Sequence, residues 1–341
     1  MAVTIYDVAK LARVGIGTVS RAINNSQQIK PETKERVMRA IEELGYTPHA
    51  MAQGLARRKT GIIAAIMPFY TGHFYHELMR GMQRALVSIS YDLILYYVEQ
   101  SEKRDHFLDR TLREKRCDGV LVISMDVPEE FQKKYAEAEL PMVLVDRSQT
   151  GIDSVRVENE DGALQATRYL ISHGHKRIAM ISGNSQSMPA RERYAGYVRA
   201  LREAGLEPDD QLYLPAERLD DQAELQENDG FNEKAGQAAA EKLLRESGKD
   251  FTAIFSASDI LAIGATKAIR AAGLSIPDDI AIVGFDDIEL SSYLGLSTMK
   301  QPMFDMGNLA VKRLMEKIEN KDTTVKQIIL SPQLVLRDSS G

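Results

Sequence analysis

The sequence is poor in cysteine: Cys117 is the only one among 341 residues. A single cysteine excludes an intrachain disulfide and any metal site built from clustered cysteines. No stretch approaches the roughly 20 consecutive apolar residues that a membrane-spanning helix needs. The N-terminal segment carries Asp7 and lacks the apolar run of a secretory signal. We therefore expect a cytoplasmic protein.

The common motifs of enzymes are also missing. The sequence has no Gly-x-Ser-x-Gly nucleophile elbow, Walker loop, dinucleotide fingerprint or His-Glu-x-x-His zinc motif. The pair Asp286-Asp287 has no histidine or third acid nearby at metal-ligand spacing. The sequence therefore predicts a protein that is not an enzyme and holds neither a cofactor nor a metal.

Composition indicates a globular protein with an uneven distribution of charge. Hydrophobic residues make up 44% and charged residues 27%, and 341 residues suggest two or three folded units. Residues 1–59 contain ten lysines and arginines against five acids, although the whole chain has a net charge of -6. A basic head on an acidic body is typical of a polyanion-binding module joined to a domain that does not bind nucleic acid.

The basic head has the pattern of three short helices. Thr4 precedes an apolar-periodic run, and Asp7 follows three residues later, which together indicate a helix start. Gly15 allows a tight turn before a second helix at 16–24, and a third helix follows at 31–44. This arrangement is that of a helix-turn-helix, whose second helix suits the major groove. A small helical bundle without a ligand is the alternative that periodicity alone leaves open.

Several side chains of the head are of DNA-contacting types. Arg21 has the forked guanidinium that pairs with guanine O6 and N7, whereas Thr18, Ser20, Asn24 and Thr33 are short polar residues of the kind that contact phosphates.

Residue identity decides between the two alternatives for the head. The runs Val3-Thr4-Ile5-Tyr6-Asp7-Val8-Ala9 and Thr18-Val19-Ser20-Arg21, in this order and spacing, closely resemble the headpiece of the lactose-repressor (LacI/GalR) family. The resemblance extends over essentially the whole chain. It implies a transcription regulator, expected to be a repressor, that binds a palindromic operator as a homodimer. Ile16 and Gly17 match the leading positions of the family's recognition helix, and Gly17 offers no side chain for direct readout.

The resemblance also implies a hinge helix at about 48–58, completing a headpiece at 1–59. A helix of this length is marginal alone, so we expect it to form only when packed or bound. Leu55 matches the residue that wedges into the central base step of the minor groove. A plain linker is the alternative. The predicted DNA-binding residues are Thr4, Tyr6, Ile16, Gly17, Thr18, Ser20, Arg21, Asn24, Thr33, Ala52, Leu55 and Ala56.

Beyond the head, short apolar runs alternate with amphipathic segments. The runs predict buried parallel strands at 62–67, 93–98, 119–123, 142–145, 177–181, 253–255 and 280–283. The amphipathic segments predict helices at 75–88, 161–173, 194–204, 234–245 and 260–272. Alternation of this kind predicts doubly wound sheets, and the length of the region requires more than one of them.

The predicted fold is an all-α helix-turn-helix headpiece followed by an α/β core of two doubly wound lobes at 60–341. Resemblance to periplasmic sugar-binding proteins and to the repressor core places the N-lobe at 60–157 and 300–327. It places the C-lobe at 158–299 and 328–341.

Ligands of doubly wound sheets lie beyond the carboxyl ends of the strands, here in the cleft between the lobes. Carboxylates, a guanidinium, an amide and aromatic faces after these strands suit a carbohydrate. The predicted effector-binding residues are Phe69, Phe74, Tyr75, Asp146, Arg193, Phe231, Ser258, Asp286 and Gln301. The resemblance implies contacts by most of these, although Ser258 stands where the family often has asparagine. A helix cap for the aspartates and a structural salt bridge for Arg193 are the alternatives.

The acidic stretch at 215–230 is longer than usual for the family and leads directly into Phe231. It either covers the pocket or forms a solvated insertion, and we favour the insertion.

The predicted mechanism is allosteric: an effector in the cleft moves the lobes, and the hinges and operator affinity follow. A purine-type regulator that needs a co-repressor is one alternative. A second is a catabolite-control-type regulator with a phosphorylated carrier protein as partner, because residues 301–307 resemble the matching stretch of such members. A periplasmic solute-binding protein would share the core but lack the recognition helix. No leucine-heptad tail follows Leu336, so we expect a dimer and not a tetramer.

Overall fold

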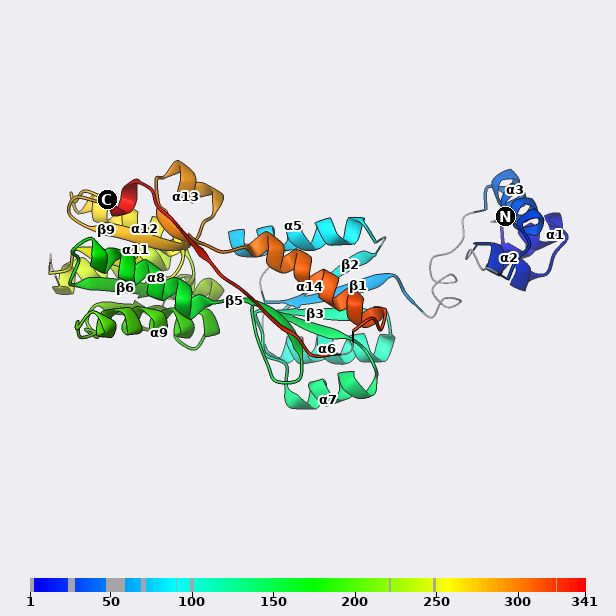
Figure 1. Ribbon diagram of the computed structural model, residues 1–341, viewed down its shortest axis with the longest axis horizontal. Helices are drawn as coiled ribbons and strands as arrows, with labels where there is room; N and C mark the ends of the chain where they lie inside the picture. Colours follow the sequence, from blue (N-terminus) through cyan, green and yellow to red (C-terminus); the bar gives the residue numbers. More distant parts are fainter. Residues whose placement is uncertain are drawn as a thin grey trace.

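The computed structural model describes residues 3–23, 28–46, 59–68, 72–89, 91–98, 101–220, 222–247, 250–322 and 324–341. The N-terminal part is a three-helix unit, seen in blue in Figure 1, with helices α1 Ile5–Leu11, α2 Ile16–Ile23 and α3 Pro31–Leu44. Its small apolar core is centred on Val8, Val19 and Val37, all fully buried. The predicted hinge helix at about 48–58 lies outside the described residues.

The start of α1 has the predicted capping pair in a modified form. The Asp7 carboxylate accepts hydrogen bonds from the Thr4 backbone N–H at 2.8 Å and from the Thr4 hydroxyl at 2.7 Å. These bonds favour the ionised carboxylate and lower the pKa of Asp7. Asp7 therefore makes the half of the capping box in which the N3 side chain accepts from the N-cap N–H, and the Thr4 hydroxyl also donates to it.

The first lobe is built on a six-stranded sheet whose strands all run parallel. Its strands are β1 Ile62–Met67, β2 Asp92–Tyr97, β3 Gly119–Ile123, β4 Met142–Val145, β5 Asp153–Val157 and β11 Gln327–Leu330, in the order β11-β5-β4-β3-β1-β2. Its helices are α5 His73–Val87, α6 Ser101–Glu114, α7 Glu129–Glu137 and α14 Met303–Ile318. Helices α5 and α14 cover one face of the sheet, and α6 and α7 cover the other (Figure 1).

The second lobe has a sheet of the same design, with one antiparallel strand at its edge. Its strands are β6 Ile178–Ser182, β7 Tyr213–Pro215, β8 Ala253–Ser256, β9 Ala281–Asp286, β10 Ser297–Lys300 and β12 Gln333–Val335, in the order β12-β10-β9-β8-β6-β7. Its main helices are α8 Asn159–Ser172, α9 Met188–Glu203, α11 Glu233–Ser247, α12 Asp259–Ala271 and α13 Glu289–Tyr293. The chain order reverses beside β1 in the first sheet and beside β6 in the second, and such reversals are where doubly wound sheets bind ligands.

Three connections join the lobes, after β5, β10 and β11 (Figure 1). Two of them fall slightly later than predicted. Lys300 still pairs with Asp286 in the second sheet, so that connection follows Lys300 and not residue 299. Leu330 pairs with Val157 in the first sheet, so the last connection follows Leu330 and not residue 327.

The predicted fold class, a helical headpiece followed by two doubly wound lobes, is confirmed. Within the described residues, every helix is too short or too polar to cross a lipid bilayer.

Candidate functional site

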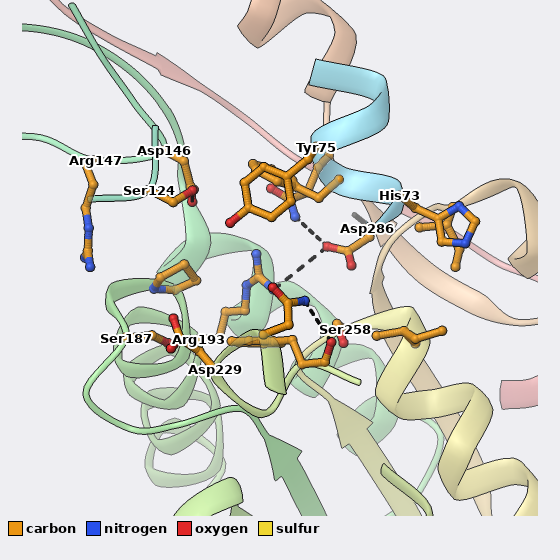
Figure 2. A pocket seen from close by; sticks show the side chains of 18 residues that line it. His73, Tyr75, Ser124, Asp146, Arg147, Ser187, Arg193, Asp229, Ser258 and Asp286 are labelled. Atoms are coloured by element: carbon orange, nitrogen blue, oxygen red, sulfur yellow. Dashed lines mark hydrogen bonds and ion pairs between the residues drawn. The ribbon is translucent and has the colours of Figure 1, made fainter. Parts of the chain in front are cut away.

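A cavity of about 320 Å³ lies between the lobes, at the carboxyl ends of the parallel strands (Figure 2). The first lobe contributes Gly72, His73, Phe74, Tyr75, Ser124, Asp146 and Arg147. The second lobe contributes Ser187, Pro189, Arg193, Asn228, Asp229, Phe231, Ser258, Ile260, Asp286 and Ile288, and Gln301 lies on a connection between the lobes. This volume is in the range of pockets that enclose small molecules.

All predicted effector residues that the structure describes line this cavity. They are Phe74, Tyr75, Asp146, Arg193, Phe231, Ser258, Asp286 and Gln301. Phe69 lies outside the described residues. The structure therefore brings together side chains that the sequence separates widely, and their contact with an effector stays a prediction.

Arg193 is the central cation of the cavity. Helix α9 carries it, and its side chain is only 5% exposed. Its Nε donates to Asn159 Oδ1 at 2.9 Å, and one terminal nitrogen donates to the backbone carbonyl of Ala257. The guanidinium lies 3.9 Å from the centre of the Phe285 ring and 3.9 Å from Asp286 Oδ1. Burial lowers the pKa of Arg193, and the nearby aspartates oppose that shift.

Asp286 and Gln301 reach the cavity from the ends of neighbouring strands. Parallel pairing of β9 and β10 sets Asp286 opposite Lys300, so the next residue, Gln301, lies beside the aspartate. Gln301 Nε2 donates to Asp286 Oδ1 at 2.5 Å. Burial raises the pKa of Asp286, although Arg193 favours its ionised form. Gln301 Oε1 is buried and has no hydrogen-bond partner among the described residues.

Asp146 presents a second buried carboxylate from the first lobe. It follows β4 with a positive φ of 59°, and its N–H donates to the carbonyl of Val155 at 2.9 Å. The Ser124 hydroxyl donates to Asp146 Oδ2 at 2.8 Å. Burial raises the pKa of Asp146. Tyr75, near the start of α5, lies beside this pair, to its right in Figure 2.

Ser258 has a structural role as well as a place in the lining. Its hydroxyl accepts a hydrogen bond from the N–H of Leu261 at 3.3 Å and so caps α12. The next residue, Asp259, is fully buried and accepts hydrogen bonds from Ser291 and Thr298. This carboxylate therefore ties the segment after β9 to β10, behind the cavity wall.

Most described residues of the stretch at 215–230 are exposed, as the favoured insertion predicts, but its end also reaches the cavity. It contains short helices at Ala216–Arg218 and Ala223–Gln226 and a turn at Glu227–Gly230. Asn228 and Asp229, both with positive φ, bring the chain back to the cavity wall. The Phe231 ring then packs on Gly183, where an added Cβ would lie 2.3 Å from the ring. The end of the segment, at Asn228 and Asp229, is therefore part of the cavity wall.

Other lining residues also went unpredicted, among them His73, Ser124 and Arg147. Each follows a strand of the first lobe, as Asp146 does, and that position was the available signal.

The headpiece presents the exposed side of α2 as its candidate DNA-reading surface. Ile16, Gly17 and Arg21 are exposed there, and Arg21 Nε donates to the carbonyl of Gly17 at 3.2 Å. Among the other predicted DNA contacts, Thr4 and Tyr6 are exposed, whereas Thr18, Ser20 and Thr33 are partly buried. The remaining predicted contacts Asn24, Ala52, Leu55 and Ala56 lie outside the described residues.

Comparison with known families gives two matches. Residues 4–49 match the model of bacterial regulatory proteins, lacI family, and residues 167–340 match that of a periplasmic binding protein-like domain. The chain is 36% identical over 340 residues to catabolite control protein A of Priestia megaterium, with 98% of each chain covered. It is 35% identical over 346 residues to the HTH-type transcriptional repressor PurR of Aliivibrio fischeri, again with 98% of each covered.

Two solved structures are similar over 99% of both chains. One is a complex of the transcriptional regulator CelR with cellobiose, at a TM-score of 0.72 and 31% identity. The other is a lac repressor dimer bound to operator and the anti-inducer ONPF, at a TM-score of 0.84 and 28% identity.

Proposed function

The chain belongs to the lacI family of bacterial regulatory proteins, and from that membership we propose its effector class and the roles of its site residues. As a member it is a DNA-binding transcriptional regulator under the control of an effector. We propose that the effector is a carbohydrate and that it binds in the cavity between the lobes. We further propose that the protein acts as a homodimeric repressor on a palindromic operator, because half-sites follow the twofold symmetry of a dimer.

The observation that carries the carbohydrate proposal is the composition of the cavity. Asp146 and Asp286 are acceptors for hydroxyl groups, and Arg193 and Gln301 add donors. Aromatic rings on the wall suit the apolar face of a sugar ring. The cellobiose bound by a similar regulator supports the same class of ligand.

The roles of the cavity residues follow from the lobes that carry them. Asp146 and Tyr75 belong to the first lobe, whereas Arg193 and Asp286 belong to the second. A ligand that contacts both sets stabilises one arrangement of the lobes over another. The first lobe continues toward the headpiece through β1, so its position governs the spacing of two headpieces on DNA. Coupling of this kind is typically worth about 1–3 kcal/mol in operator affinity.

On the DNA side, we propose that Arg21 reads a base in the major groove. Ile16 and Gly17 flank it on the same exposed side of α2 and set the shape of the contact. Thr4, Tyr6, Thr18, Ser20 and Thr33 are assigned to the phosphate backbone.

A thermal-shift screen tests the effector class. The full-length protein is heated with monosaccharides, disaccharides, phosphosugars and nucleobases in turn. We expect a sugar at a hundredfold excess over its Kd to raise the melting temperature by roughly 5–10 °C, because it binds only the native state. A shift produced by nucleobases alone would contradict the carbohydrate proposal and favour the purine-type regulator instead. A phosphorylated carrier protein as partner stays a prediction from sequence.

A further inference from the structure

We propose that Asn159, Glu192 and Arg156 are positioning residues that transmit a change at Arg193, inside the cavity, to the first lobe. These three residues are here called the interlobe path. The inference rests on the proposed function, because it concerns how an effector in the cavity regulates DNA binding. None of the three lines the cavity, and none was among the effector contacts expected from sequence.

The interlobe path lies where the chain first crosses from one lobe to the other. Arg156 belongs to β5 of the first lobe, and Asn159 is the first residue of α8 in the second. Glu192 lies on α9, directly before the cavity arginine. Pairing of β5 with β4 on one side and β11 on the other fixes the backbone of Arg156 within the first sheet. A movement of Arg156 is therefore a movement of the first lobe.

A continuous set of contacts joins Arg193 to Arg156. Asn159 is fully buried and uses both ends of its amide. Its Oδ1 accepts a hydrogen bond from Arg193 Nε at 2.9 Å, and its Nδ2 donates to Glu192 Oε2 at 3.0 Å. The other carboxylate oxygen of Glu192 lies 3.7 Å from a terminal nitrogen of Arg156. Because an amide has both an acceptor and a donor, Asn159 connects the buried cation to the carboxylate that faces the other lobe.

The part of the interlobe path within the second lobe is rigid. Helices α8 and α9 approach each other so closely that a Cβ added at Gly196 would lie 2.1 Å from the carbonyl oxygen of Glu160. Closely packed elements transmit a small displacement and do not absorb it. A displacement of Arg193 is therefore expected to appear at the pair of Glu192 with Arg156, where the two lobes meet.

The pair of Arg156 with Glu192 is suited to change as the lobes move. Its length of 3.7 Å exceeds that of a hydrogen bond, so a small movement decides whether the two groups bond or separate. Arg156 also lies 3.9 Å from Glu158, near it on the chain, and so keeps an acidic partner when Glu192 moves away. The free-energy difference between the two states is therefore small, as a two-state element requires.

The effector acts on this pair through Arg193. The guanidinium donates to Asn159 and faces Asp286 at 3.9 Å. A ligand that accepts hydrogen bonds from Arg193 competes with these two partners and changes the position of the guanidinium. The interlobe path passes that change to Glu192, whose contact with Arg156 then favours one arrangement of the lobes over another.

Titration with an inverted-repeat duplex, selected from a random pool, tests the inference on the full-length protein. The Kd for the duplex is measured without ligand and with cellobiose, maltose, ribose or glucose in turn, at a concentration that saturates each variant by calorimetry. The variants are Glu192→Gln, which keeps an acceptor for Asn159 and removes the charge, Arg156→Gln, and the two combined. We expect the sugar that shifts the wild-type Kd to give a roughly two- to fivefold smaller shift in each single variant, the scale of one partly exposed ion pair. The combined variant should lose no more than either single variant, because both changes remove the same contact.

The matched control is Glu160→Gln, because Glu160 pairs with Arg199 at 3.5 Å between the same two helices but within the second lobe. It should leave the shift unchanged, and melting curves confirm that every variant folds. An unchanged shift in Glu192→Gln, or an equal loss in Glu160→Gln, overturns the interlobe path and leaves the carbohydrate function standing. A wild-type protein whose duplex binding no sugar alters contradicts the carbohydrate function, and the inference with it.

Discussion

Replacement of Arg193 by alanine is expected to abolish the effector response and to leave operator binding intact. The guanidinium is almost fully buried, bonds to Asn159 and Ala257, and faces Asp286. Its removal takes away donors to the ligand and leaves a buried carboxylate without its cation. Truncation of one partner of such a pair costs about 2–5 kcal/mol, so we expect effector affinity to fall by about 30-fold or more.

The measurement is a pair of titrations, one with the sugar that the screen identifies and one with operator DNA. Arg199→Ala is the matched control, because Arg199 lies on the same helix, is half exposed and pairs with Glu203 at the surface. It should leave both titrations unchanged. A melting curve confirms that each variant is folded. An Arg193→Ala protein with the wild-type effector curve would remove Arg193 from the site.

Replacement of Arg21 by alanine is expected to weaken operator binding and to relax base preference at one position in each half-site. Arg21 lies on the exposed side of α2, and its Nε is held by the carbonyl of Gly17. A guanidinium contact with guanine is worth about 1–3 kcal/mol of discrimination, which corresponds to roughly a 5–150-fold loss on the operator. Binding curves on the operator, on its single-base variants and on a random duplex measure both the loss of affinity and the change in base preference.

The control for this variant is Arg39→Ala, on α3, where the arginine is exposed and pairs with Glu35. It removes an equal charge from the headpiece and should preserve base preference. Equal losses of Arg21→Ala on operator and on random duplex would instead identify a phosphate contact, because such contacts carry no sequence information.

The starts of the three helices in the headpiece were predictable because their signals are local. Thr4 and Asp7 mark the start of α1, Pro31 stands at the first position of α3, and Gly45 ends that helix with a φ of 61°. The strands made of continuous apolar runs, such as Gly119–Ile123, were also predicted, because such runs are typical of a sheet interior. Five strands with shorter or more polar sequences were missed, namely Asp153–Val157, Tyr213–Pro215, Ser297–Lys300, Gln327–Leu330 and Gln333–Val335.

The cavity was predictable in its membership but not in its connections. Strand ends pointed to Asp146 and Asp286, yet the bond between Asp286 and Gln301 depends on the register of β9 and β10, which the sequence does not show. The acidic composition of 215–230 indicated exposure correctly for most of the stretch, but it did not show that Asn228 and Asp229 line the cavity. The Asn-Asp-Gly sequence at 228–230 was the available signal for a turn, because these residue types tolerate the left-handed backbone conformation that all three adopt.

The most direct test of the central claim is one titration of the full-length protein with an inverted-repeat duplex selected from a random pool. It is performed without sugar and with the stabilising sugar at saturation, at one fixed salt concentration. We predict specific binding to the duplex in one condition and a shift of roughly 5–150-fold in Kd between the two. Identical curves in both conditions, or binding to the duplex no tighter than to bulk genomic fragments, would contradict the claim that a ligand in the cavity between the lobes controls specific DNA binding.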